Sequence, residues 1–204
     1  MAQPFTKSIT ISCSETDAVI YANSKEMGKG TAEVIVPKNG SVIVEVKKPG
    51  FLPASTYFYN MKNQPNPPKT FHFILEKDDS YDASSNSDNA NVDFTINTTK
   101  TEDEAWKLIN IIVTGAFDNL ETQDFKTGYL KTAWEVQSFK QNTVRTRIIV
   151  KLGSISPLAY KIKLVSEYSG KAGTSVKNDE SFKPWDRVLR KYADIVSEMQ
   201  TRLK

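Results

Sequence analysis

The sequence predicts two domains, a small all-β sandwich followed by an α+β domain with an antiparallel sheet, two helices and the order β-α-β-β-β-α. Three observations lead to this fold class. Short runs of alternating apolar and polar residues, separated by turn residues, fill residues 1–77. Residues 78–91 are acidic and rich in Ser and Asn, and helical periodicity begins only after residue 92. At 204 residues, of which 39% are hydrophobic, the chain is long enough for two small packed domains.

The first domain, residues 1–77, is predicted to contain six short strands. Residues 8–13 alternate apolar and polar side chains, the period-two pattern of a half-buried strand. Asn39-Gly40 is a hairpin signal, and Asn23, Gly28 and Gly30 mark further turns because these residues tolerate a left-handed backbone. Many short strands in about 70 residues indicate a β-sandwich. The expected strands cover residues 8–13, 18–22, 33–36, 42–46, 57–59 and 71–75, with a proline-rich loop at 63–68.

Residues 78–91 are predicted to form a flexible linker. The segment has four aspartates, no Lys or Arg, and almost no apolar side chain. Such a composition buries too little surface to offset the entropy of ordering the chain. A calcium loop is the alternative, but that loop requires regularly spaced ligands and a central glycine, and the segment has neither.

The α+β domain is predicted over residues 92–204. A strand at 92–96 is followed by Thr101 and Glu104, which have the spacing of a capping box and so predict a helix start. Apolar residues then recur at helical spacing as far as Ala116. Alternating patterns predict strands at 128–136, 144–151 and 160–165, with one buried and one solvated face.

A long amphipathic helix is predicted at the C-terminus. Ser181 or Asp179 would cap it, and Pro184 is tolerated in a first helical turn. Apolar residues from Trp185 to Leu203 follow at helical spacing and would face the core. Trp134, on the apolar side of the strand at 128–136, is also expected in the core.

Three groups of turn residues in the first domain have a pattern that occurs in a known family. They are Ala18, Tyr21 and Asn23; Gly28 and Thr31; and Lys48, Gly50 and Phe51. Over about residues 8–76 the pattern resembles the PEGA family of small extracytoplasmic β-domains. There, Ala-x-Val-Tyr-x-Asp-Gly leads to Gly-x-Thr-Pro, and a later strand ends in Lys-x-Gly-Tyr. Ser24 stands for a family glycine, Ala32 for a proline, and residues 14–17 replace the tetrapeptide that names the family.

The second domain contains the run Thr127–Trp134, a strand with Arg145 and Arg147, and an amphipathic C-terminal segment. Over about residues 92–204 this arrangement resembles the helix-grip domains of outer-membrane assembly lipoproteins, in which a bent antiparallel sheet holds a long C-terminal helix. The two resemblances imply a periplasmic or cell-surface location, with a signal or anchor missing from this sequence. A cytoplasmic location is the alternative, because the first residues contain no apolar signal core.

Residues with catalytic or metal-binding chemistry are few. Cys13 is the only cysteine and is expected in the core, and His72 is the only histidine and is expected on the solvent face of a strand. We therefore predict no catalytic site, no cofactor and no metal. A hydrolase that uses Glu135 and Glu167 as paired carboxylates is a further alternative. No run of 18 apolar residues is present, so no transmembrane segment is predicted.

A basic face is predicted on three neighbouring strands of the second domain. From Phe94 onward the chain carries 18 basic and 13 acidic residues, a net charge of +5. Such a face could meet an anionic glycan, a lipid head group or an acidic partner; solubility and protection of sheet edges are the alternative. Nucleic acid is not expected, because stacking aromatics are not interleaved with the charge. The residues of this face are Lys131, Arg145, Arg147, Lys151, Lys161 and Lys163.

Two hypotheses of function follow. The first is a non-enzymatic cell-envelope protein that acts as a scaffold by binding a protein partner. The second is a glycan- or cell-wall-binding module, which exposed aromatic side chains on the first domain would favour. Membrane association is expected only through a partner or through an N-terminal anchor outside this sequence. The candidate loop contacts for polysaccharide are Asn23, Lys25, Lys29, Tyr57 and Tyr59.

Overall fold

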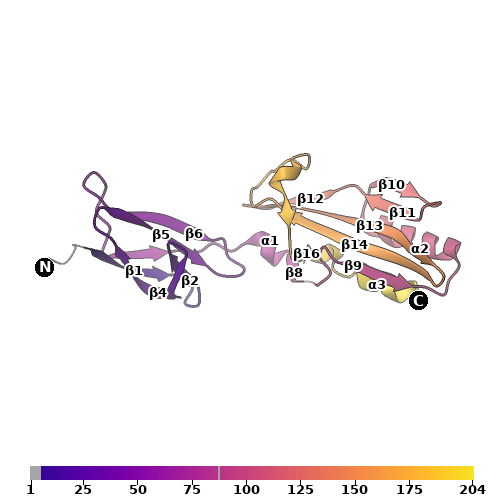
Figure 1. Cartoon of the computed structure of the whole chain (residues 1–204), viewed down its shortest axis with the longest axis horizontal. Helices are drawn as coiled ribbons and strands as arrows, with labels where there is room; N and C mark the ends of the chain where they lie inside the picture. The colour runs from indigo at the N-terminus through magenta and orange to yellow at the C-terminus, as the bar shows by residue number, and fades with distance from the viewer. Residues whose placement is uncertain (1–5, 87) are drawn as a thin grey trace. The chain divides into compact units, whose positions relative to one another are not determined.

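A computed structural model describes residues 6–86 and 88–204 of the chain (Figure 1). Strands make up 47% of the described residues and helices 17%, so the described part of the protein is mostly β. Contacts between Cα atoms group the chain into two compact units, one as far as Asp78 and one from Asp79 onward.

The first unit consists of two small sheets. One has the strand order β4-β1-β7, in which β1 is antiparallel to β4 and parallel to β7; the other has the antiparallel order β3-β2-β5-β6 (Figure 1). The strands are β1 (Lys7–Cys13), β2 (Val19–Ala22), β3 (Lys25–Lys29), β4 (Thr31–Val36), β5 (Gly40–Lys47), β6 (Ala54–Asn60) and β7 (Thr70–Phe73).

The two sheets share one apolar core. Ile9 and Ile11 of β1 are fully buried, and so are Val44 and Val46 of β5. These residues alternate with exposed or half-buried neighbours, as the period-two patterns predicted. The alternation therefore confirms these strands and the face of each that is buried.

The predicted turn region at residues 23–30 differs from expectation, because residues 25–29 form strand β3. The reversal between β2 and β3 needs only Asn23 and Ser24, whose φ angles are 48° and 67°. Positive φ at both central residues is typical of a two-residue hairpin turn. Gly30, at φ 66°, is required for a different reason: a Cβ there would lie 2.4 Å from the carbonyl oxygen of Thr16.

Lys48 fixes the corner that follows β5. Its Nζ lies 2.6 Å from a carboxylate oxygen of Glu15 and 2.7 Å from one of Asp17. The same ammonium lies 4.8 Å from the centre of the Phe51 ring. Lys48 thus joins the end of β5 to the turn before β2 and contacts Phe51 of the same Lys-x-Gly-Phe motif.

The second unit is built on one large sheet. Its main path is β10-β11-β13-β14-β15, with β12 paired to β13 and β9 paired to β14, and all these pairs are antiparallel. The elements are α1 (Asp79–Asp82), β8 (Ser84–Asn86), β9 (Asp93–Asn97), α2 (Glu102–Ala116), β10 (Leu120–Asp124), β11 (Tyr129–Thr132), β12 (Glu135–Ser138), β13 (Thr143–Ile155), β14 (Leu158–Tyr168), β15 (Lys183–Pro184), β16 (Arg187–Leu189) and α3 (Ile195–Arg202).

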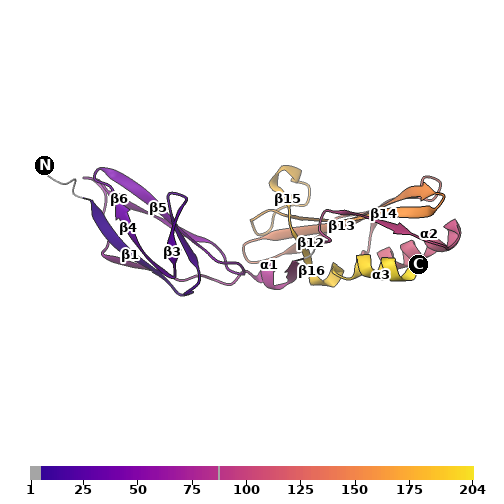
Figure 2. The same ribbon diagram turned by 60° about the horizontal axis from the view of Figure 1, so that its bottom comes forward.

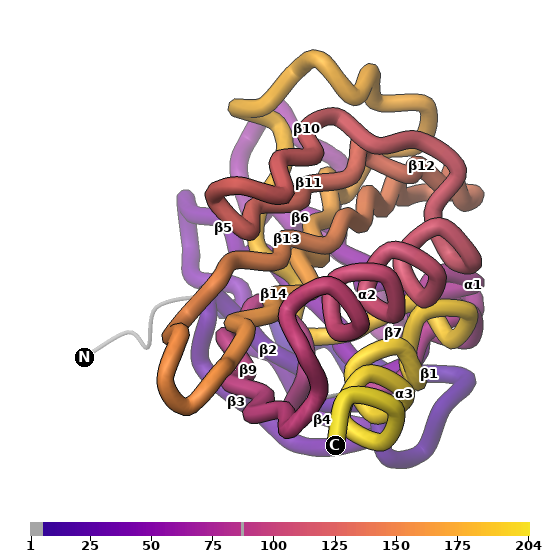
Figure 3. The backbone as a smooth tube through the Cα atoms, turned by 90° about the vertical axis from the view of Figure 1, so that its right-hand side faces the viewer, coloured from indigo at the N-terminus to yellow at the C-terminus, as the bar shows by residue number. Residues whose placement is uncertain are grey.

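Helices α2 and α3 cover one face of this sheet and lie side by side (Figures 2 and 3). The predicted capping box is confirmed, since the Thr101 hydroxyl accepts from the Glu104 amide and the Glu104 carboxylate accepts from the Thr101 amide. The Glu104 carboxylate also accepts from the Thr101 hydroxyl, and the hydrogen bonds from the Thr101 amide and hydroxyl favour its ionised form and lower the pKa of Glu104. The inward-facing residues of β13 and β14 pack against the helices. The helices do not cover the opposite face of the sheet.

The predicted long C-terminal helix is wrong. Only Ile195–Arg202 is α-helical; Lys183–Pro184 pairs with the end of β14, and Arg187–Leu189 pairs with β8. The apolar side chains of the predicted stripe are nevertheless buried. Strand, turn and helix in succession bury the same residues that one helix would have buried, so periodicity alone could not distinguish them.

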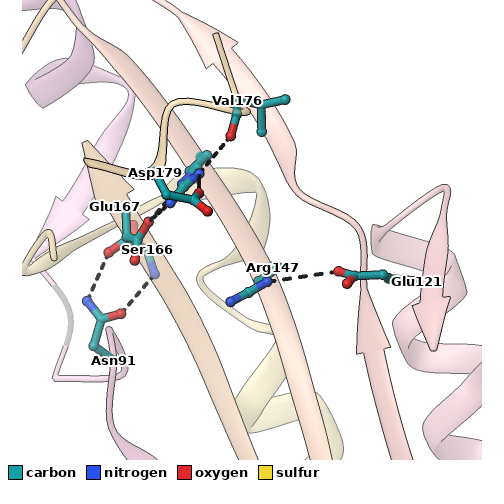
Figure 4. Close-up of polar contacts among 8 residues, drawn as sticks. Asn91, Glu121, Arg147, Ser166, Glu167, Val176 and Asp179 are labelled. Atoms are coloured by element: carbon teal, nitrogen blue, oxygen red, sulfur yellow. Dashed lines mark hydrogen bonds and ion pairs between the residues drawn. The ribbon is translucent and has the colours of Figure 1, made fainter. Parts of the chain in front are cut away.

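Residues 78–91 also differ from the predicted flexible linker, because most of the segment is built into the second unit. It forms α1 and β8, and Asn91 is hydrogen-bonded to Ser166 (Figure 4) and to Trp185. The Asn91 amide donates to the carbonyl oxygens of Ser166 and Trp185, at 2.9 and 2.8 Å, and accepts from the Ser166 amide. This polar segment is ordered by hydrogen bonds to residues that are distant in the sequence. The local composition does not predict these hydrogen bonds.

The Lys48 corner predicts a pH dependence. The hydrogen bond from Lys48 is the main reason that the pKa of Asp17 is lowered. A lowered folded-state pKa stabilises the fold above the unfolded pKa, and this contribution is lost as pH falls through the folded pKa. Lys48→Met should therefore raise the pKa of Asp17 and reduce the loss of stability in acid. NMR titration of the carboxyl carbons measures the pKa.

Lys29→Met is the matched control, because Lys29 only adds a weaker attraction to Asp17. It should raise the pKa of Asp17 less than Lys48→Met does. Equal shifts in the two variants would show that general positive charge, and not the corner, sets this pKa.

Candidate functional site

The six residues of the predicted basic face all lie on the side of the large sheet that faces away from α2 and α3. They alternate along β11, β13 and β14 with buried residues such as Leu130, Val150 and Ile162. The strand registers set them in rows: Lys131 lies opposite Ile149, which lies opposite Lys163, and Lys151 lies opposite Lys161. The structure therefore brings the six residues onto one surface, but their environments differ.

Arg145 is buried, with 4% of its side chain exposed. Its guanidinium pairs with Glu167 at 2.6 Å and with Asp179 at 2.6 Å, and donates to the carbonyl oxygen of Val176 at 2.8 Å (Figure 4). Its planar group also lies 4.2 Å from the Trp134 ring centre and 4.1 Å from that of Phe182. Every part of the guanidinium thus contacts the protein, in a geometry suited to arginine.

The predicted roles of Arg145 and Trp134 therefore need correction. Arg145 holds the loop that contains Val176 and Asp179 against the sheet, so it is not available to an external ligand. Trp134 is half-buried on the basic face and not in the core, because the strand pattern breaks after Thr132 and β12 begins only at Glu135. The guanidinium groups of Arg145 and Arg147 lie 4.2 and 4.0 Å from the centre of the Trp134 ring.

Three further residues of the basic face have acidic partners. Lys131 pairs with Glu121 at 2.7 Å. Arg147 lies 3.9 Å from the same carboxylate (Figure 4). Lys163 pairs with Asp93 at 2.9 Å. In the part of the chain that the structure describes, no carboxylate lies within ion-pair distance of Lys151 or Lys161, and both are exposed. The uncompensated positive charge of the face is therefore concentrated at these two lysines.

A groove of about 340 Å³ lies beside the predicted contacts Tyr57 and Tyr59 in the first unit. The two rings are 6.2 Å apart between centres and nearly parallel, at 18°, and Tyr57 is 57% exposed. The proline-rich loop forms the other side. The described lining residues are Thr56, Tyr57, Phe58, Tyr59, Gln64, Pro65, Asn66, Pro67, Pro68 and Phe71, and none of them is charged.

The proline loop and Phe71 were not predicted as part of a site. Phe71 comes from β7 in the other sheet, and its ring meets Phe58 edge to face at 5.2 Å. The available signal was the succession of an aromatic strand, a stiff proline segment and a second aromatic strand. Sequence alone did not show that the loop folds back over β6.

The other predicted loop contacts lie elsewhere. Asn23 and Lys25 border a second groove, of about 300 Å³, together with the exposed apolar residues Met27 and Ile35. The Asn23 side chain accepts a hydrogen bond from the Ile43 amide, so it supports the turn. Lys29 lies at the other end of β3 and does not line this groove. The five predicted contacts thus belong to separate places.

His72 is exposed on β7, and its Nδ1 lies 2.9 Å from the hydroxyl oxygen of Ser12 on the neighbouring strand. The two residues are direct cross-strand neighbours. Cys13 is buried in the first core. Among residues 6–86 and 88–204, no group of three or more His, Cys, Asp or Glu side chains is placed to hold a metal ion.

Comparison with protein-family models and with curated proteins finds no match for this chain. Within the described residues, no helix is both long enough and apolar enough to cross a membrane.

Arg145 and Arg147 form a matched pair for testing the difference between buried and exposed charge. Arg145→Met should lower the free energy of unfolding by about 3 kcal/mol or more, because it leaves the largely buried Glu167 without a partner. Arg147→Met should lower it by about 1 kcal/mol, since Glu121 remains half-exposed to water. Denaturant unfolding of both variants measures the difference. Similar losses would contradict the structural role assigned to Arg145.

Proposed function

We propose that this chain is a non-enzymatic binding protein of the cell envelope, and that its first unit binds polysaccharide in the groove beside Tyr57 and Tyr59. The observation that carries the proposal is the pair of parallel tyrosine rings, one of them 57% exposed, beside a groove whose described lining is uncharged. Contiguous exposed apolar or aromatic surface is typical of binding sites.

The chemistry of the groove suits a neutral sugar chain. The faces of sugar rings carry C–H groups, which pack on aromatic rings, and their hydroxyls require neutral donors and acceptors. Gln64 and Asn66 supply amides, and Thr56 and the tyrosines supply hydroxyls. The volume of about 340 Å³ is in the range of small-ligand sites, enough for one or two rings of a longer polymer.

The envelope location rests on the resemblances in sequence. We interpret the first unit as a PEGA-like β-sandwich, which its two sheets around one core support. We interpret the second as a helix-grip-like α+β domain, which its antiparallel sheet and the helices on one face support. The short helix α3, in place of a long one, is a departure from the helix-grip pattern.

A protein partner is the second candidate, in keeping with a scaffolding role. The observation that favours it is the second groove of the first unit, where Ile35 is 60% and Met27 37% exposed. Both residues lie on outer strands of their sheets, β4 and β3. Apolar side chains beside a sheet edge are a common place for another protein chain to dock.

Co-sedimentation of the full chain with insoluble cell-wall polysaccharide tests the first candidate. The wild type should pellet equally at low and moderate salt, because the groove is uncharged. Tyr57→Ala/Tyr59→Ala should weaken binding by about tenfold or more, since each ring face contributes roughly 1 kcal/mol to such stacking. Tyr129→Ala, which removes a half-buried tyrosine of the second unit, is the control and should bind like the wild type.

Undiminished pelleting of the double tyrosine variant would overturn the groove as the polysaccharide site. Absence of pelleting by the wild type would leave the protein-partner candidate, for which Met27→Ser/Ile35→Ser should then abolish partner capture.

A further inference from the structure

We propose that Lys151, Lys161 and Lys163 form a binding site for a tetrahedral oxyanion, the phosphate or sulfate group of a ligand. The site lies on the second unit and does not depend on the groove of the first. A cavity of about 120 Å³ is lined by these three lysines with Asp93 and Ile149.

The placement of the lysines in the sheet carries the argument. Lys151 and Lys161 are directly opposite each other on β13 and β14, and like charges in that position destabilise a sheet. Edge protection does not explain them, because both lie on interior strands at this point. Lys151 is flanked by Tyr129 of β11, and Lys161 by Thr95 of β9. An anion between the two ammonium groups would remove their repulsion.

The charges around the cavity also favour an anionic ligand. The other basic residues of this face are neutralised by Glu121, Glu167 or Asp179. At the cavity three lysines face one carboxylate, Asp93, which already pairs with Lys163. The described groups at the cavity therefore carry a net charge of +2, a match for a doubly charged anion.

The size of the cavity limits the ligand. A volume of about 120 Å³ corresponds to roughly four water molecules. It accommodates one tetrahedral oxyanion, so the rest of a larger ligand would lie outside. The hydrogen bonds from lysine ammonium groups to an oxyanion are charge-assisted, and they are therefore stronger than hydrogen bonds between neutral groups.

NMR titration of the full chain with potassium phosphate tests the site, with potassium chloride at matched ionic strength as the reference salt. Phosphate, and likewise sulfate, should cause saturable shifts at residues 149–151 and 161–163, and chloride should not. Lys151→Gln/Lys161→Gln should weaken phosphate binding by at least about tenfold, because it removes two charged hydrogen-bond donors. All substituted side chains are exposed, so the fold should persist.

Lys126→Gln/Lys177→Gln is the matched control. It changes the net charge by the same amount at two exposed lysines of the same unit that do not line the cavity, and phosphate binding should remain within about twofold of wild type. Three results would overturn the site: shifts that do not saturate, shifts that chloride reproduces, or binding that survives in Lys151→Gln/Lys161→Gln.

Vesicles distinguish the source of the oxyanion. Binding of the full chain to phosphatidylglycerol-containing vesicles, displaced by inorganic phosphate and lost in Lys151→Gln/Lys161→Gln, would assign the site to lipid head groups. Phosphate binding without vesicle binding would assign it to a soluble phosphate or sulfate group. Vesicle binding that is unaffected by both phosphate and the substitution would count against the site.

Discussion

The second unit depends on the burial of one charged side chain, Arg145. Taking a guanidinium out of water is costly, and the cost is offset only when its charge and its donors are all satisfied. Glu167, Asp179 and the carbonyl oxygen of Val176 satisfy them, and Trp134 and Phe182 enclose the planar faces. These contacts hold the loop after β14 on the outer face of the sheet. From there the chain passes the edge strand β15, and Trp185 enters the core beneath.

This arrangement divides the outer face of the large sheet into two regions. Around Arg145 and Arg147, carboxylates form ion pairs with the arginines and an indole ring contacts them. These contacts stabilise the fold. Around Lys151 and Lys161 the charge is left uncompensated by the described residues. The first unit presents a different chemistry, an uncharged aromatic groove. We therefore propose that the two units bind different ligands, one neutral and one anionic.

The sequence predicted well those features that depend on neighbouring residues. Alternation identified most strands and their buried faces, and Thr101 with Glu104 identified the start of α2. Prediction from the sequence failed where contacts between residues distant in the sequence determine the structure. Strand β8 and the placement of Asn91 depend on pairing with Arg187–Leu189 and on Ser166, and the C-terminal helix was shortened by the same pairing. The common basic face was predictable because side chains alternate between the two faces of a strand. The burial of Arg145 depends on a loop about 30 residues away, and no local sequence pattern predicts where that loop lies.

Amide hydrogen exchange of the full chain, with and without a soluble fragment of cell-wall polysaccharide, tests most directly the claim that the aromatic groove is the polysaccharide site. We expect slower exchange in β6, in the proline-rich loop and at the start of β7, where the groove residues lie. We expect unchanged exchange in the loop that Arg145 holds, because the contacts of that loop with Arg145 stabilise the fold and do not bind ligand. Protection confined to residues 23–29 or to the second unit, under conditions where the fragment binds, would contradict this claim.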